Sequence, residues 1–202
     1  MTTGQQHRAA RTVLRAALIG GIVAMTAHAM AADSAAIAEK AKVCVGCHGP
    51  DGNSKDPAIP TIAGQPKQFI TTQLVMFREK NRKNDAMLPF VANLSNAEIN
   101  DFGTYFSAQT MQTAAPPLAE DKAAEGRKLV TQFNCNQCHG PTLKGLQHIP
   151  RLAGQQPVYL RTQLLGFKAQ TRFDMDGNMT SAAQALQPPD IELIARYLSG
   201  LE

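Results

Sequence analysis

Apolar residues recur at helical spacing in several parts of the chain, and no long stretch alternates between apolar and polar residues as a half-buried strand would. The stretch from about 66 to 80 shows the helical pattern most directly. Its apolar positions fall close to one helical face, at Phe69, Ile70, Leu74 and Phe77. The pattern predicts an all-α protein.

Two further helices are predicted from a start signal that is followed by an apolar face. Ser95 and Glu98 can form a capping box at the start of one helix, and Asp190 is the candidate N-cap of the other. The apolar faces consist of Ile99, Phe102 and Phe106 in the first, and of Ile191, Ile194, Tyr197 and Leu198 in the second. Another helix is expected over roughly 34–47, whereas the Gly- and Pro-containing stretch 49–64 has no apolar period and is predicted to be a loop.

The chain contains one pattern twice. CVGCHGP at 44–50 matches CNQCHGP at 135–141, and IPTIAGQPKQFITTQLVMF at 59–77 matches IPRLAGQQPVYLRTQLLGF at 149–167. A repeat of this kind predicts two copies of one small domain. Between the copies, Pro116 and Pro117 stop a helix and favour an extended connector. We expect an N-terminal domain over 32–114 and a C-terminal domain over 115–202.

The first residues have the layout of a secretory signal peptide: a basic region, a short apolar run and a small-residue cleavage site. The basic residues are Arg8, Arg11 and Arg15. The apolar run contains two glycines and is shorter than the roughly 20 apolar residues of a membrane span, which disfavours a retained anchor. We predict a signal peptide over 1–31, cleaved after Ala29 or Ala31, and export to an oxidising compartment.

The net charge of the chain is lower once the signal peptide is removed. The whole chain has a formal net charge of +4, but residues 1–31 contain three arginines and no acidic residue, so the mature charge is 17 − 16 = +1. A nucleic-acid-binding function therefore loses its electrostatic support.

The strongest chemical signal is the C-x-x-C-H motif, at Cys44, Cys47 and His48. On a helix, residues i, i+3 and i+4 share a face, so the two thiols and the imidazole point the same way. Thiols so placed can add across the two vinyl groups of haem, and the histidine can bind the iron; this is the attachment signature of c-type haem. The second copy repeats the motif at Cys135, Cys138 and His139.

Zinc and a redox disulfide are the alternatives. Structural zinc takes four ligands, and each motif offers three. A disulfide would not require the histidine, and no βαβ pattern surrounds the cysteines. Each copy has only about 85 residues, a size at which an apolar core alone is marginal. A large flat cofactor would complete that core, which favours two covalently bound haem c groups.

The other axial ligand is predicted from the histidines that remain. After cleavage the chain retains only three histidines, so bis-histidine ligation at both irons is excluded, and a methionine thioether is the natural distal ligand. Met87 lies in a predicted loop of the first copy. In the second copy Met175 and Met179 compete, and Met179 is favoured because it precedes Leu186 by the same seven residues that separate Met87 from Leu94. The third histidine, His148, is expected to be a solvated loop residue.

Two pairs of equivalent residues are candidates for supporting roles. Pro60 and Pro150 follow the proximal histidines by 12 and 11 residues, and a carbonyl there could accept the imidazole Nδ1–H; alternatively, each proline only shapes its loop. Arg82 and Arg172 could pair with haem propionates or could be solvated surface residues.

The duplicated C-x-x-C-H-G-P motifs, the I-P-x-x-A-G-Q segment after each, and the closing Y-F-S and Y-L-S helices resemble the dihaem cytochromes c4, over nearly the whole mature chain. The resemblance implies two class I cytochrome c domains in tandem, related by approximate twofold symmetry with their haems near the domain interface. It also implies a periplasmic electron carrier that serves terminal oxidases and is either soluble or loosely attached to the membrane.

We therefore expect an electron carrier and not an enzyme. Cys44, Cys47, Cys135 and Cys138 are expected to hold the haems, and His48, Met87, His139 and Met179 to ligate the irons. Redox proteins are the expected partners: a quinol-oxidising complex or another donor, and cytochrome c oxidase as acceptor. The alternatives are a dihaem peroxidase, which needs one open iron site, and a haem subunit of a larger oxidoreductase.

Overall fold

The computed structural model describes residues 36–202, so the predicted signal peptide lies outside the described residues. Within 36–202 the regular structure is helical, with a single isolated bridge between Leu146 and Ile149. The all-α prediction is therefore confirmed. In this part of the chain no helix is both long enough and apolar enough to span a bilayer.

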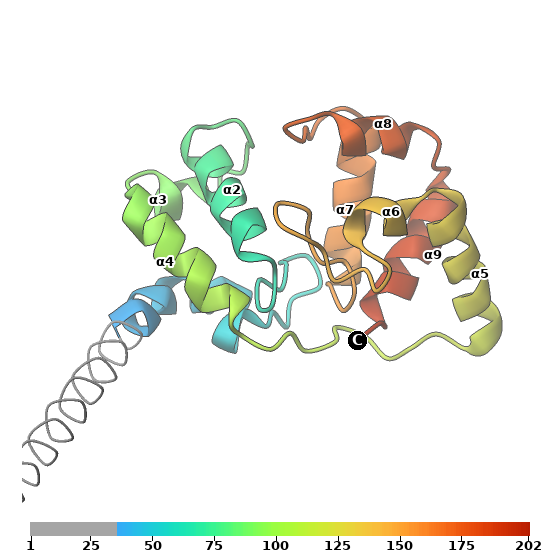
Figure 1. Cartoon of the computed structure of the whole chain (residues 1–202), viewed down its shortest axis with the longest axis horizontal. Helices are drawn as coiled ribbons and strands as arrows, with labels where there is room; N and C mark the ends of the chain where they lie inside the picture. Colours follow the sequence, from blue (N-terminus) through green and yellow to red (C-terminus); the bar gives the residue numbers. More distant parts are fainter. Residues whose placement is uncertain (1–35) are drawn as a thin grey trace, which may run out of the picture. The chain divides into compact units, whose positions relative to one another are not determined.

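The first copy is built from one helix that carries the cysteine–histidine motif and from the helices that follow it (Figure 1). The motif helix covers residues 36–48. It is followed by the 3₁₀ turn η1 (Pro50–Gly52), α2 (Lys67–Arg78), α3 (Leu88–Val91) and α4 (Asn96–Ser107). Helix α2 packs against α4 and contacts α3.

The second copy repeats this order with one difference at its first helix. Its helices are α5 (Glu120–Gln132), α6 (Cys135–His139), α7 (Pro157–Lys168), α8 (Asn178–Gln184) and α9 (Pro188–Ser199). Asn134 has a left-handed backbone, with φ 56°, and separates α5 from α6. The continuous motif helix of the first copy is thus two helices here. Helix α9 packs against both α5 and α7, and α8 packs against α7 (Figure 1).

Each copy has its own apolar core, formed by the helical faces that the sequence predicts. Ile70, Phe102 and Phe106 form the centre of the first core together with Ala41. The centre of the second core includes Val130, Leu160, Leu186, Ile191, Ile194 and Leu198. Cys44 packs against the first cluster and Cys135 against the second, so the haem-attachment motifs border these cores.

The predicted helix starts are right in one copy and need correction in the other. At α4, Glu98 N donates to Ser95 Oγ at 3.2 Å and Ser95 N donates to Glu98 Oε2 at 3.0 Å, which is the expected capping box. At α9 the N-cap is Gln187, and Asp190 is the third helical residue, whose carboxylate accepts from Gln187 N at 2.9 Å. The helix begins earlier than predicted because its first two residues are prolines, which the first turn of a helix tolerates. Proline lacks a backbone N–H, and the N–H groups of the first turn have no partner within the helix.

Two short helices were not predicted. Met87 was expected in a loop, but it is the N-cap residue of α3, and Met179 lies in the first turn of α8. Helices of four and seven residues are too short to show an apolar period, so the sequence pattern gives no signal for them.

The connector between the copies is anchored at both ends. On the side of the first copy, the buried Asn53 donates through Nδ2 to the Thr110 carbonyl at 3.0 Å and accepts from Gln112 N at 2.7 Å. On the side of the second copy, Ala114 N donates to the Gly154 carbonyl at 3.1 Å. The connector is extended, as its prolines predict, and its backbone forms hydrogen bonds with both copies.

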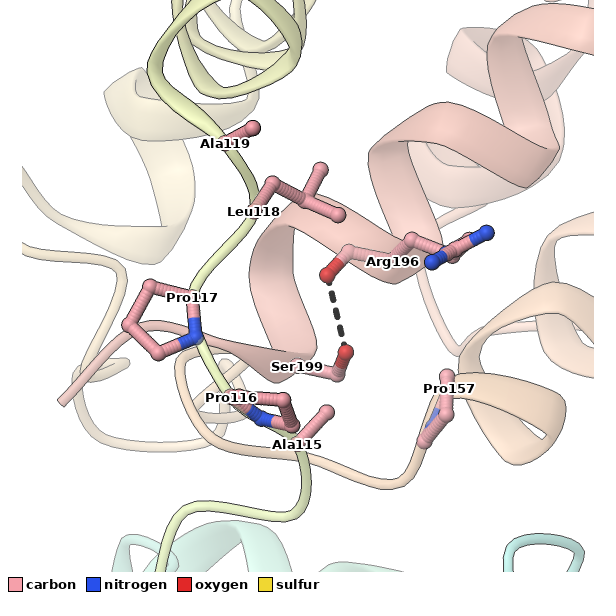
Figure 2. Close-up of a pocket in the computed structure, with 8 residues that line it drawn as sticks. All are labelled: Ala115, Pro116, Pro117, Leu118, Ala119, Pro157, Arg196 and Ser199. Carbon is pink, nitrogen blue, oxygen red and sulfur yellow. Dashed lines mark hydrogen bonds between the residues drawn. The ribbon is translucent and has the colours of Figure 1, made fainter.

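Where the connector crosses the second copy it leaves a pocket of about 390 Å³ (Figure 2). The lining residues are Ala115, Pro116, Pro117, Leu118, Ala119, Pro157, Arg196 and Ser199. Ser199 Oγ donates to the Arg196 carbonyl at 2.8 Å, so this hydroxyl is already used within α9 (Figure 2). The pocket contains none of the predicted haem-binding residues.

The capping box of α4 gives a direct test of the fold. Ser95→Ala removes the acceptor for Glu98 N, and we expect the free energy of unfolding of the holoprotein to fall by about 1 kcal/mol. Chemical denaturation measures this change. Asn100→Ala, an exposed position on the same helix, is the control and should leave stability nearly unchanged. Equal losses in the two variants would contradict a capping role for Ser95.

Candidate haem sites and the interface between them

The first motif lies at the end of the helix over residues 36–48, with its three chemical groups on one helical face. His48 is buried, with 7% of its surface exposed, whereas Cys47 is exposed and Cys44 is half-buried. In the second copy His139 is 4% exposed, and Cys138 and Cys135 repeat the exposed and half-buried pattern. None of these four cysteines forms a disulfide.

Each motif histidine is held by a backbone carbonyl of the following loop. His48 Nδ1 lies 2.8 Å from the Pro60 carbonyl oxygen, and His139 Nδ1 lies 2.8 Å from that of Pro150. Because a carbonyl only accepts, Nδ1 must carry the hydrogen in both rings. The Nε2 lone pair is then left to bind a metal, and the bond to the carbonyl fixes the orientation of the ring.

The environment of the histidines favours the neutral ring that a metal requires. Burial lowers the pKa of His48 and of His139, and the hydrogen bond to the proline carbonyl offsets only part of that effect. Burial also raises the pKa of Cys44 and Cys135. Buried neutral imidazoles beside free thiols and an apolar cluster fit a covalently attached haem. In 36–202 no group of three or more Cys, His, Asp or Glu side chains is placed to hold a metal ion by itself.

The two candidate distal methionines share a local anchor. Met87 N donates to Asn84 Oδ1 at 3.2 Å, and Met179 N donates to Asp174 Oδ2 at 2.8 Å. Both side chains are partly buried, whereas Met175 is 76% exposed. The side-chain oxygen a few residues earlier therefore fixes the backbone of each methionine at the start of a short helix.

The I-P-x-x-A-G-Q segments join the two copies. Gln155 Nε2 donates to the Thr61 carbonyl at 2.8 Å, and its Oε1 accepts from Thr61 N at 2.8 Å. Gln65 Nε2 donates to the Arg151 carbonyl at 2.9 Å, and its Oε1 accepts from Arg151 N at 3.0 Å. Thr61 and Arg151 are equivalent positions in the repeat. Each glutamine thus binds the same backbone position of the other copy, as a twofold relation requires.

A second pair of contacts repeats this exchange. Phe69 N donates to the Gln147 carbonyl at 3.1 Å, and Tyr159 N donates to the Pro57 carbonyl at 2.9 Å. Phe69 is equivalent to Tyr159, and Pro57 to Gln147. The same loop therefore orients the histidine through Pro60 or Pro150 and binds the other copy through the residues on either side. The proximal side of each candidate haem site is tied directly to the interface.

Arg82 and Arg172 are drawn into this interface and are not solvated surface residues. Arg82 Nη1 donates to Gln73 Oε1 at 2.6 Å, while its Nη2 donates to Tyr159 Oη at 3.2 Å and to Gln163 Oε1 at 3.0 Å. Arg172 Nη1 donates to the same Gln163 oxygen. Each guanidinium also lies over an aromatic ring of its own copy, 4.6 Å from the Phe77 centroid and 4.5 Å from that of Phe167.

Sequence reasoning missed three sets of functional contacts. The glutamines of I-P-x-x-A-G-Q, Tyr159, and the side chains of Asn84 and Asp174 were not assigned a role. Only the glutamines carried a signal, because the same polar residue at equivalent positions of two otherwise different copies indicates a shared role. Tyr159 carried none, since its partners come from the other copy.

The chain matches the sequence profile of the family described as Cytochrome c over residues 31–113 and again over 123–202. Fold and sites together therefore define a protein with two tandem cytochrome c domains. A protein named cytochrome c4 from Pseudomonas aeruginosa is 36% identical over 185 residues, 87% of this chain and 91% of the relative. The crystal structure of reduced recombinant cytochrome c4 from Pseudomonas stutzeri is similar with a TM-score of 0.76 at 30% identity, over 84% of this chain and 98% of that one.

The chain belongs to the dihaem cytochrome c4 family. It is a c-type electron carrier with two covalently bound haem c groups, which confirms the cofactor prediction. A further relative, from Thiomonas intermedia, is named thiosulfate dehydrogenase electron acceptor. It is 30% identical over 200 residues, covering 94% of this chain and 90% of the relative.

The interface glutamines generate the second test. Gln155→Ala leaves the N–H and the carbonyl of Thr61, which is 1% exposed, without partners, and we expect the free energy of unfolding to fall by about 2 kcal/mol. The Thr61 amide should also exchange its hydrogen faster. Gln68→Ala, an exposed position on α2, is the control. An unchanged exchange rate at Thr61 would contradict the role assigned to Gln155.

Proposed function

We propose that this cytochrome carries single electrons in the periplasm between respiratory-chain partners, from a quinol-oxidising complex or another donor toward a terminal oxidase. The observation that carries this proposal is the equivalence of the two sites. Each has a buried imidazole oriented by a proline carbonyl and a partly buried methionine anchored by a side-chain oxygen. Two equivalent sites favour an electron carrier over an enzyme in which the two haems have different roles and one iron has an open site.

In this proposal each residue of the two sites has a defined task. Thioether bonds to Cys44 and Cys47, and to Cys135 and Cys138, retain the haems in an exported protein. His48 and His139 supply the proximal nitrogen, and Met87 and Met179 supply the distal sulfur. With these histidines and methionines as its ligands, the haem iron would transfer one electron between the Fe(III) and Fe(II) states, and the methionine sulfur would raise its reduction potential.

The choice of Met179 over Met175 rests on exposure and on anchoring. Asp174 accepts from Met179 N at 2.8 Å, from Thr180 N at 3.1 Å and from Thr180 Oγ1 at 3.0 Å, so it caps the first turn of α8. Met175 precedes this turn, and its side chain is 76% exposed. The anchored methionine is the better candidate because its backbone is held before the sulfur binds.

Exposed apolar side chains next to the two methionine segments support transient docking. Phe90 is 47% exposed and lies three residues after Met87, and Phe173 is 56% exposed and follows Arg172. Together with a predicted mature charge of +1, they favour small and partly apolar encounter surfaces, as in weak redox complexes. We expect little long-range electrostatic steering.

A second candidate function is electron acceptance within a larger oxidoreductase. The name of the Thiomonas intermedia relative supports it, because that protein accepts electrons from a dehydrogenase of a sulfur anion. The two functions differ in the donor and share the same haem chemistry.

Substitution of the methionines tests the ligand assignment. Met179→Ala should remove the thioether-to-iron absorption band of one ferric haem, so that about half of the total amplitude from the two haems remains. The same variant should produce one high-spin signal. Met175→Ala is the matched control and should keep the full band. Visible absorption and electron paramagnetic resonance of the ferric holoprotein measure both effects. Loss of the band in Met175→Ala instead would show that the assignment is wrong.

Reaction with isolated partners tests the proposed route. The reduced holoprotein should be oxidised by membrane vesicles that carry a cytochrome c oxidase, and the rate should change by less than about threefold between low and physiological salt. The rate is followed by stopped-flow absorption. A protein that is reduced by a dehydrogenase but is not oxidised by the vesicles would favour the second candidate. Rapid reaction with peroxide would contradict the carrier function itself.

A further inference from the structure

The connector places one buried side chain against both I-P-x-x-A-G-Q segments. Met111 is 9% exposed and belongs to the first copy, because the Cytochrome c profile matches that copy through residue 113. Its backbone N and its Cβ lie beside Gly64, where an added Cβ would be 3.3 Å from each of them. Its sulfur lies beside Gly154, where an added Cβ would be 3.3 Å from Sδ. Met111 therefore packs against the same position of the repeat in both copies.

The two glycines have similar backbones but are held differently. Gly64 has φ 62° and Gly154 has φ 77°, in the left-handed region that favours glycine. Each N–H donates to the closing helix of its own copy, at 2.9 Å to the Phe106 carbonyl and at 2.9 Å to the Leu198 carbonyl. The carbonyl of Gly154 also accepts from the connector, through Ala114 N at 3.1 Å. The glycine of the second copy is thus supported on one side by its own helix and on the other by the connector.

The backbone on either side of Met111 is fixed by the first copy. Asn53 is 5% exposed, and its Nδ2 donates to the Thr110 carbonyl at 3.0 Å. Its Oδ1 accepts from Gln112 N at 2.7 Å. Because one buried amide pairs with the residues before and after Met111, the direction of the methionine side chain is fixed as well.

Gly154 lies inside the loop that orients the second proximal histidine. The Pro150 carbonyl, four residues earlier, accepts from His139 Nδ1 at 2.8 Å. Gln155, one residue later, binds the N–H and the carbonyl of Thr61. The stretch from Pro150 to Gln155 is therefore held at its end by Gln155 and at Gly154 by Met111 and the connector backbone.

We propose that Met111 is a positioning residue for the second haem site, a side chain of the first copy that holds the loop whose carbonyl orients His139. The hydrogen bond from Nδ1 to that carbonyl makes the imidazole a stronger donor. The reduction potential of the second haem then depends on a residue of the first copy. This inference rests on the proposed ligation of iron by His139 and is independent of the proposed donor and acceptor.

Met111→Ala tests the role, because it keeps the Cβ beside Gly64 and removes the sulfur beside Gly154. In the ferrous holoprotein, the Nδ1–H of His139 should exchange at least about tenfold faster, measured relative to the slowest backbone amides, which report global unfolding. The Nδ1–H of His48 should change by less than about twofold on the same relative scale. Nuclear magnetic resonance follows both hydrogens.

Met76→Ala is the matched control. It truncates another buried methionine of the first copy, 8% exposed and located in α2. It should lower the stability to a similar extent and leave the relative exchange of the His139 Nδ1–H within about twofold. Met111→Leu keeps an apolar group near the position of the sulfur and should restore exchange to within about twofold of wild type.

The potential of the second haem provides an independent readout. At a fixed solution potential, Met111→Ala should lower the ferric-to-ferrous ratio of one haem by at least about twofold, because a weaker bond to Pro150 makes His139 a weaker donor to Fe(III). The other haem should stay within about 1.5-fold. Met111→Val also removes the sulfur, and it should act in the same direction if Met111→Ala folds poorly. Spectral resolution of the two haems measures both ratios.

Several results would overturn the proposal. An unchanged relative exchange of the His139 Nδ1–H in Met111→Ala would show that the loop is held without Met111. Equal acceleration at His48 and His139, the same acceleration in Met76→Ala, or no recovery in Met111→Leu would contradict a specific contact. Faster exchange with unchanged ferric-to-ferrous ratios would contradict the effect on potential.

The wild-type protein tests the ligation separately. The ring hydrogens of His139 should be shifted upfield by the ring current of the haem to which the imidazole is bound. An unshifted ring would contradict the proposed ligation, whereas the exchange difference between Met111→Ala and Met76→Ala would still decide whether Met111 holds the loop.

Discussion

The hydrogen bond from each imidazole Nδ1 to a proline carbonyl is the contact on which the rest of the arrangement depends. It is 2.8 Å long in both copies, and it fixes the ring, its tautomer and the direction of the free Nε2. Because the carbonyl belongs to a loop, the loop must itself be held. The residue after each proline is held by a glutamine of the other copy, through both its N–H and its carbonyl.

This coupling gives a physical reason for the two-domain construction. A long loop without secondary structure leaves many backbone groups unpaired, and in one small domain these would have to face water. Here each copy satisfies part of the loop backbone of the other, with amide side chains that are 2% and 3% exposed. Thr61, Gln65 and Gln155 are buried and make hydrogen bonds across the contact between the copies. Orientation of the proximal ligand and association of the domains are therefore one structural problem.

Symmetry is kept where it serves both copies and is broken at a few side chains. The exchanged contacts of Gln65 with Arg151 and of Gln155 with Thr61 need the same residue twice. By contrast, Gln156 Nε2 donates to the Ser54 carbonyl at 2.7 Å, and the equivalent Pro66 cannot reciprocate. Tyr159 and Phe69 differ in the same way. Such differences give the two equivalent haem sites different surroundings.

Much of the fold and the chemical core of each site could be predicted from the sequence. The apolar period predicted the long helices, and the repeat predicted the duplication, because both depend on residues that are neighbours in sequence or at equivalent positions. The C-x-x-C-H spacing indicated haem for the same reason, since one helical turn places its three groups on one face. The start of α9 was misplaced because Asp190 was taken as the N-cap, whereas it is the third helical residue and its carboxylate accepts from Gln187 N. The short helices α3 and α8 were missed because they are too short for a period.

The sequence by itself determined that the chain is helical, that it is duplicated, and that it binds haem through motif residues one turn apart. Only the tertiary structure decided what lies between the copies. The partners of Gln155, Arg82 and Tyr159 are 94, 81 and 77 residues away in sequence. No local pattern encodes such pairs, because they form only when two loops and two helices from different copies are brought together. For the same reason, the sequence left open whether Arg82 and Arg172 are surface residues, whereas in the folded chain both donate hydrogen bonds to Gln163.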